Sequence, residues 1–305
     1  MTKHTRLALI TSVWLLLAGA AETQAQHFLL ESADRLKLHN VTAEPSTLQG
    51  KKGLQLTLPE EVRRRVNRLQ SMTPEERERN MTPEERARVR HGLPFLVGQL
   101  ALVQEVEFSN GTIEVELAGA PEPAVRETAR GFVGIAFRLQ EDLQTYDAFY
   151  LRPTNGRAED QERRNHSVQY ISHPEWPWFR LRKETPSKYE SYVDLVPGQW
   201  TKIRIEVDGE RARLYVHGNE QPTLIVNDVK SGADASGGVA LWLEPGTVAH
   251  FRNLTIKPRL VGDTRPHLWG DIEDHRGLSK AETVVADWTR SAEDERAVRN
   301  QEGGR

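Results

Sequence analysis

A succession of short segments with a period of two, between residues 95 and 258, limits the fold more than any other feature. In segment 110–117, Ile113, Val115 and Leu117 alternate with polar residues. The same alternation recurs in segments 131–139, 147–153, 200–218 and 237–258, without a helical period between them. Successive side chains of a strand point to opposite faces, so each segment predicts a strand. At least eight such strands predict an all-β chain, a two-sheet antiparallel jelly-roll sandwich.

Turn-forming residues support this prediction. Asp208 and Gly209 join two alternating runs as a hairpin turn would, and segment 244–246 separates another pair. Residues 35–58 contain one or two further strands. We therefore expect the jelly-roll domain to span residues 26–258.

The N-terminus is typical of a secretory signal. Lys3 and Arg6 precede an apolar run of 15 residues, Leu7 to Ala21. A membrane span needs roughly 20 residues, and small residues suited to cleavage before Gln26 follow the run. We predict that residues 1–25 are a signal peptide and that the protein is secreted, periplasmic or extracellular. The alternative is an uncleaved N-terminal anchor.

Composition excludes several classes of function. The chain has no cysteine, which excludes disulfides, thiolate metal sites and a cysteine nucleophile. Its formal net charge is −3, so no overall basic field favours a nucleic-acid partner. After removal of residues 1–25, no other stretch is long and apolar enough to span a bilayer.

Residues 59–92 are dense in Glu and Arg and contain the repeat Met-Thr-Pro-Glu-Glu-Arg, at 72–77 and 81–86. Each copy has the Thr-x-x-Glu pattern of a capping box with Pro at the first helical position. The segment predicts two or three short, exposed helices inserted between strands. It is either a lid or a docking arm for a protein partner, or a solvated insertion held helical by Glu–Arg pairs. Residues 259–305 form a polar extension, partly helical or disordered.

One sheet face carries unusual side chains. If Ile135, Phe149 and Leu241 point into the core, their neighbours point outward. The outward set has a floor of Gly134, Ala136 and Ala240, with walls of Arg138, Tyr150, Arg152 and Trp242. Aromatic rings stack on sugar C–H faces, and Arg reaches hydroxyls, so the pattern predicts a carbohydrate groove. The alternative is that Tyr150 and Trp242 pack under a loop or under the insertion.

Residues 154–165 make an overlong connection of mixed charge at the end of this face. It contributes further candidate ligand contacts, together with the strand after it: Asn155, Arg157, Arg164, Asn165, His166 and Gln169. The alternative is a salt-bridged loop that fastens two strands, with a structural His166. In the following turn, Pro174 and Pro177 present Trp176 and Trp178. We expect one of these Trp residues to pack and the other to contact ligand.

The segments around 108–117, 131–138, 146–170, 197–207 and 237–256 together resemble the concanavalin A-like lectin/glucanase superfamily. The likeness is greatest to laminin-G-like and keto-disaccharide-hydrolase-like domains of secreted bacterial proteins. The resemblance covers residues 35–258, with 59–92 as an insertion. It implies a jelly roll whose concave sheet holds a carbohydrate.

Acidic residues do not identify a reaction. The related glucanases carry clustered strand acids of the form Glu-x-Asp-x-x-Glu, and no segment matches; Glu114 and Glu116 fit a polar strand face. No metal motif occurs, although calcium is common in the superfamily and Glu141, Asp142 or Asp208 are candidates for it. We predict no cofactor, and the sequence identifies no catalytic residue for the case that the protein is an enzyme.

The sequence thus predicts a secreted glycan-binding jelly roll. Two alternatives stay open: a glycoside hydrolase of the keto-disaccharide type, and a laminin-G-like module that binds a protein partner.

Overall fold

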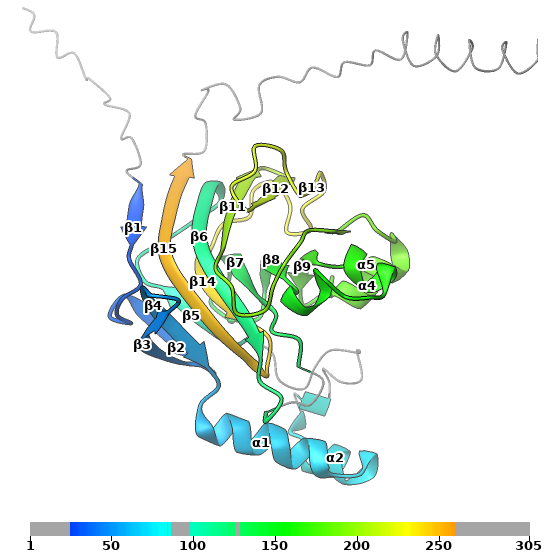
Figure 1. Cartoon of the computed structure of the whole chain (residues 1–305). Coiled ribbons are helices and arrows are strands. Elements are labelled where there is room, and N and C mark those ends of the chain that lie inside the picture. Colours follow the sequence, from blue (N-terminus) through cyan, green and yellow to red (C-terminus); the bar gives the residue numbers. More distant parts are fainter. Residues whose placement is uncertain (1–24, 84, 87–97, 126–128, 260–305) are drawn as a thin grey trace, which may run out of the picture. The chain divides into compact units, whose positions relative to one another are not determined.

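The computed structural model describes residues 25–83, 85–86, 98–125 and 129–259, which form two antiparallel sheets (Figure 1). Within these residues, sheet A has eight strands. In spatial order they are β13 (Leu224–Val226), β12 (Arg211–Val216), β11 (Thr201–Asp208), β6 (Asn110–Pro121), β15 (Thr247–Arg259), β4 (Lys51–Thr57) and β3 (Thr42–Leu48), and β1 (Gln26–Phe28) also pairs with β15.

Sheet B has seven strands within the same described ranges. Their spatial order is β10 (Glu190–Ser191), β9 (Val168–His173), β8 (Tyr146–Leu151), β7 (Val133–Leu139), β14 (Gly238–Leu243), β5 (Leu100–Val103) and β2 (Leu36–His39). The predicted all-β, two-sheet antiparallel jelly roll is confirmed.

The core is built from the alternation seen in the sequence. Ile113, Val115 and Leu117 of β6 are buried, and in sheet B the Phe137 ring stacks on Phe149 at 6.1 Å between centroids. Burying an aliphatic or aromatic side chain of this size contributes roughly 1.5–3 kcal/mol. The two sheets therefore pack together mainly through these inward-facing rows of apolar side chains.

The charged insertion forms helices, as predicted. α1 (Glu60–Ser71) and α2 (Pro74–Asn80) follow β4. The repeated hexapeptide explains the local geometry, because Thr73 and Glu76 form a full capping box at the start of α2. In the second copy, Thr82 and Glu85 make the same pair of bonds.

The arginine of each repeat reaches back to the preceding helix. Arg77 donates to the Leu69 carbonyl oxygen at 2.8 Å, and Arg86 donates to the Glu78 carbonyl oxygen at 3.2 Å. Each arginine thus satisfies a carbonyl near a helix end, where intrahelical donors are missing. Val66 of α1 packs with Leu58 and Val125 in a small cluster separate from the main core.

Short helices also interrupt the predicted all-strand region. The 3₁₀ helix η1 (Pro153–Asn155), α4 (Gln161–Asn165) and α5 (Trp178–Glu184) lie on the connections before and after β9 (Figure 1). The prediction of strand alone between residues 95 and 258 is wrong at these helices. They are too short to show a helical period of apolar residues, and a loop residue such as Asp160 is enough to cap one. No helix in the described part of the chain is long and apolar enough to cross a membrane.

Candidate functional site

A row of side chains crosses the outer face of sheet B. Cross-strand pairing aligns Trp242 with Gly134, Gly134 with Tyr150, Tyr150 with Gln169, and Gln169 with Glu190. Residues that pair across strands share a face, and the alternate residues fill the core, so this row points away from sheet A. A Cβ on Gly134 would lie 2.6 Å from the Cα of Tyr150, so this position holds glycine. The predicted register of Tyr150, Trp242 and Gly134 on one face is confirmed.

Arg152 connects the row at one end. Its Nη2 donates to the Tyr150 hydroxyl at 2.9 Å and to Gln169 Oε1 at 3.0 Å, and its Nη1 donates to Glu190 Oε2 at 3.4 Å. The side chain is buried, and its Nε–H has no partner among the described residues. A buried donor without a partner costs about 1–3 kcal/mol, so this N–H is an unmet hydrogen-bonding demand within the cluster.

Glu190 is the buried acid of the site. Its side chain is 2% exposed, and it accepts two parallel hydrogen bonds from Arg182, at 2.7 and 2.6 Å. His166 Nδ1 lies 2.9 Å from Glu190 Oε2. Charge-assisted bidentate pairing of this kind compensates the burial of a carboxylate and holds its neighbours in place. Tyr150, Arg152, His166, Gln169, Arg182 and Glu190 are called the Arg152 cluster below.

His166 is held in its neutral form. Burial lowers its pKa below the usual 6.5, and the charges of Arg182 and Arg152 lower it further, whereas Glu190 opposes them. Neither ring nitrogen makes a well-aligned hydrogen bond to another described residue. Burial also raises the pKa of Tyr150, against the opposing effect of Arg152, so its hydroxyl stays protonated. The cluster therefore offers a neutral imidazole beside a guanidinium.

Aromatic rings border the cluster. The Trp242 ring lies 4.8 Å from Tyr150 and its indole donates to the Tyr146 hydroxyl, leaving the side chain 8% exposed. Tyr150 and Trp242 are therefore packed side chains, as the alternative interpretation of the sequence expected, and not open walls of a groove. Trp178 is 41% exposed, and the guanidinium of Arg152 lies 5.6 Å from the centre of its ring. Trp178 is thus the accessible aromatic surface of the site.

Trp176 has a different role. Its ring lies between the guanidinium of Arg180, at 3.9 Å, and the ammonium of Lys230, at 4.7 Å, and it packs against the core. Cation–π contacts on both sides fix such a ring. The structure therefore places Trp176 as the packing member of the pair and Trp178 beside the Arg152 cluster.

The charged loop before β9 is braced by its own side chains. Asn155 donates to the His166 carbonyl oxygen and accepts from Arg163, and Arg157 forms a bidentate pair with Asp194 at 2.7 and 2.8 Å. Arg164 donates to Tyr192, and Asn165 accepts from Gln161. No side-chain bond within the described residues joins Asn155, Arg157, Arg164 or Asn165 to the side chains of the Arg152 cluster, so the structure favours the fastening loop over a ligand-binding one.

Arg138 is not on the outer face, and that prediction is wrong. The pairing of β7 with β14 shifts register between Gly238 and Ala240, and Arg138 has a φ of +54° there. The irregularity turns the side chain toward the loops of sheet A, where it donates to the carbonyl oxygens of Ser109, Gly209 and Gly232. A β-bulge re-aims a side chain in this way, and strict alternation fails to predict it.

Sequence reasoning also missed two members of the cluster. Glu190 lies in the two-residue strand β10, too short for any alternation to be recognised. Arg182 lies on the seven-residue helix α5. The only local signal was the placement of Glu190 directly after the buried Tyr189, which gives one inward and one outward residue.

Two of the three acids considered for calcium, Asp142 and Asp208, have protein partners. Asp142 accepts from the backbone N–H groups of Gln144 and Thr145, and Asp208 pairs with Arg211 and Arg259. Among the residues that the structure describes, no group of three or more His, Cys, Asp or Glu is arranged to hold a metal ion.

The fold and this sheet face define a jelly roll of the lectin/glucanase type. The chain belongs to the family of 3-keto-alpha-glucoside-1,2-lyase-like domains, whose family model matches residues 76–257. A search of curated proteins finds no match to the sequence.

Several solved structures are similar at low identity. A carbohydrate binding module from Bacillus subtilis is 11% identical, with 72% of this chain and 95% of that chain covered and a TM-score of 0.40. A protein of unknown function with a galectin-like fold, also from Bacillus subtilis, is 10% identical, with coverages of 77% and 96% and a TM-score of 0.41. A putative glycosyl hydrolase from Parabacteroides distasonis is 11% identical, with coverages of 54% and 78% and a TM-score of 0.35. Similarity at this level assigns no function.

Proposed function

We propose that the protein binds a carbohydrate at the Arg152 cluster, against Trp178. The observation that carries this proposal is the unpartnered Nε–H of buried Arg152 beside the exposed ring of Trp178. Membership in a family named for keto-glucosides supports a sugar as the ligand.

The chemistry of the site suits a sugar ring. The apolar C–H face of a pyranose stacks on an indole, while its hydroxyls need donors and acceptors at the ring edge. Arg152 Nε supplies a charged donor, and the neutral His166 ring supplies a nitrogen that accepts. Gln169, Glu190 and Tyr150 hold Arg152 in place, so little side-chain entropy is lost on binding.

A glycan array followed by calorimetric titration of the best ligand tests this proposal. We expect Trp178→Ala to weaken binding about tenfold or more, because it removes the stacking surface. Tyr192→Ala is a matched control, since Tyr192 is 42% exposed and lies outside the cluster. Equal losses in the two variants, or no loss in either, would contradict the site.

Cleavage of a 3-keto-α-glucoside is a second candidate, favoured by the contact between His166 and Glu190. A C–H bond next to a ketone is acidic, so a neutral imidazole can take its proton while a guanidinium stabilises the developing enolate oxygen. Collapse of the enolate then breaks the neighbouring C1–O bond, and the leaving oxygen receives a proton. His166 would be the base and Arg152 the cation.

Release of p-nitrophenol from its 3-keto-α-glucoside measures this reaction. The wild-type protein should release it, and His166→Gln should reduce the rate at least a hundredfold, the lower end of the usual contribution of a general base. A rate in His166→Gln equal to that of the wild type would contradict the catalytic role, and would leave sugar binding as the function.

Export and partner binding are part of the same proposal. Residues 1–24 lie outside the described residues, so the signal peptide rests on the sequence pattern alone. N-terminal sequencing of the exported protein should start at Gln26; an intact Met1 would contradict cleavage. A protein partner for residues 59–92 stays a prediction, as does the extent of the domains.

A further inference from the structure

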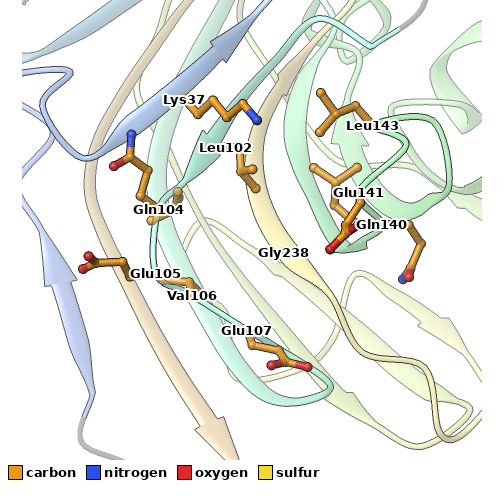
Figure 2. Close-up of a pocket in the computed structure, with 12 residues that line it drawn as sticks. Lys37, Leu102, Gln104, Glu105, Val106, Glu107, Gln140, Glu141, Leu143 and Gly238 are labelled. Atoms are coloured by element: carbon orange, nitrogen blue, oxygen red, sulfur yellow. The ribbon is translucent and has the colours of Figure 1, made fainter.

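We propose a second sugar-binding subsite in a hollow at the far end of the outer face of sheet B, so that the protein prefers an oligosaccharide to a single sugar unit. This inference rests on the proposed carbohydrate function. Figure 2 shows the hollow, with Leu102 and Gly238 at its centre and Lys37, Glu141 and Leu143 around it. Its volume is about 900 Å³.

The hollow lies on the same face as the Arg152 cluster. Leu102 pairs with Ala240 and Lys37 pairs with Leu102, so these side chains share the face of Trp242, two residues further along β14. From Gly238 to Trp242 is about 13 Å, since a strand rises about 3.3 Å per residue. The Arg152 cluster starts at Tyr150, two strands beyond Trp242 and thus about 10 Å across the sheet, so a ligand that touches both places runs diagonally over the outer face.

The side chains around the hollow fall into two groups. Glu105 pairs with Arg35, Glu107 accepts from Ser236, and Gln140 donates to two carbonyl oxygens. In contrast, the side chains of Lys37, Gln104 and Glu141 make no hydrogen bond or ion pair to the rest of the described chain, although they line the same space. These three offer a cation, an amide and a carboxylate that need no rearrangement to meet a ligand.

The chemistry of the hollow indicates the class of sugar. Leu102 and Leu143 give an apolar floor for the C–H face of a ring, while the carboxylate of Glu141 accepts from hydroxyls or an ammonium group. Glu105, Glu107 and Glu141 outnumber Lys37, so the local charge is negative and disfavours an acidic sugar. The volume lies within the range of about 300–1,000 Å³ that is usual for small-molecule sites. We infer that a neutral or amino sugar unit occupies this subsite, and that a uronate does not.

The chain-length dependence of binding tests this subsite. The best ligand from an array of neutral, amino and acidic oligosaccharides is titrated as a series from disaccharide to hexasaccharide. Wild-type affinity should rise with length, and the Lys37→Gln/Glu141→Gln double variant should bind the hexasaccharide about tenfold more weakly while binding the disaccharide normally. The Lys52→Gln/Glu159→Gln variant removes the same charges at exposed positions away from the hollow, and should match the wild type.

The two proposals fail in different ways. If the double variant binds every length as the wild type does, while Trp178→Ala loses binding, the second subsite is wrong and the first stands. A preference for uronate oligomers would also contradict the subsite. If the wild type binds no glycan in the array, the proposed function itself is wrong, and the subsite with it.

Discussion

Two buried arginines, Arg138 in β7 and Arg152 directly after β8, differ in how completely they are hydrogen-bonded. Arg138 directs all three guanidinium nitrogens to acceptors, among them the carbonyl oxygens of Ser109, Gly209 and Gly232. Arg152 is equally enclosed, but its Nε–H has no partner among the described residues, and its ring neighbour Trp178 is exposed. The fully bonded guanidinium of Arg138 fastens loops, whereas that of Arg152 keeps one donor unused beside an accessible aromatic ring. The proposed carbohydrate site therefore rests on incomplete hydrogen bonding, and not on residue type or burial.

The largest effect that this comparison predicts is on stability, at Arg138. Arg138→Met removes the donors of several loop carbonyls and the cation beside Asp147, whose pKa burial already raises. Breaking a buried charged network in this way costs about 3–5 kcal/mol of unfolding free energy. Urea denaturation followed by tryptophan fluorescence measures it. A variant that is fully stable but no longer binds glycan would reverse the assignment of the two arginines.

The two tryptophans sharpen the same contrast. Trp176→Ala should lower the unfolding free energy by about 2 kcal/mol, because the ring packs on the core between Arg180 and Lys230. Trp178→Ala should change stability much less. Chemical denaturation of both variants gives the two values, and a larger loss in Trp178→Ala would show that the packing roles are exchanged.

Lowering the pH tests the neutral state of His166. Its pKa is lower in the folded chain than the usual 6.5, so the unfolded chain takes up a proton first as the pH falls. Stability is therefore full above pH 6.5 and decreases as the pH falls from there toward the folded pKa. His166→Gln should flatten this part of the stability–pH curve. Burial also lowers the pKa of His250, so His250→Gln is the control that corrects for its contribution in the same direction. An unchanged slope in His166→Gln would mean that His166 titrates as it does in the unfolded chain.

The smallest effect is expected in the charged loop. Arg157 pairs with Asp194 at the surface, where exposed ion pairs contribute little. Arg157→Gln should leave both the thermal midpoint and glycan affinity unchanged within error. Differential scanning calorimetry and glycan titration check the two quantities. A loss of affinity would return this loop to the site.

The sequence predicted the regular part of this face well. The period of two placed Tyr150, Trp242 and Gly134 on one side, because side-chain direction in a strand follows from position alone. It failed at Arg138, where a register shift and a positive φ reverse the direction. Alternation assumes regular pairing, and it carries no information about where β7 takes up an extra residue against β14.

The chemistry of the site was harder to predict for a different reason. Glu190 accepts from both Arg152 and Arg182 only because the chain turns through α5, and no spacing in the sequence encodes these contacts. The loop 154–165 looked like a site because it is rich in charge. Several of its charges have nearby partners, such as Asp194 for Arg157, and this can be seen only in three dimensions.

The most direct test of the carbohydrate site is the substitution Arg152→Lys, measured by calorimetric titration of the best glycan together with a thermal melt. Lysine keeps a cation opposite Glu190 and loses the Nε–H, so the charge pair survives while the unpartnered donor is removed. We predict that affinity falls about tenfold while the thermal midpoint changes by only a few degrees. Unchanged affinity in a folded Arg152→Lys protein would contradict the claim that this guanidinium binds the sugar.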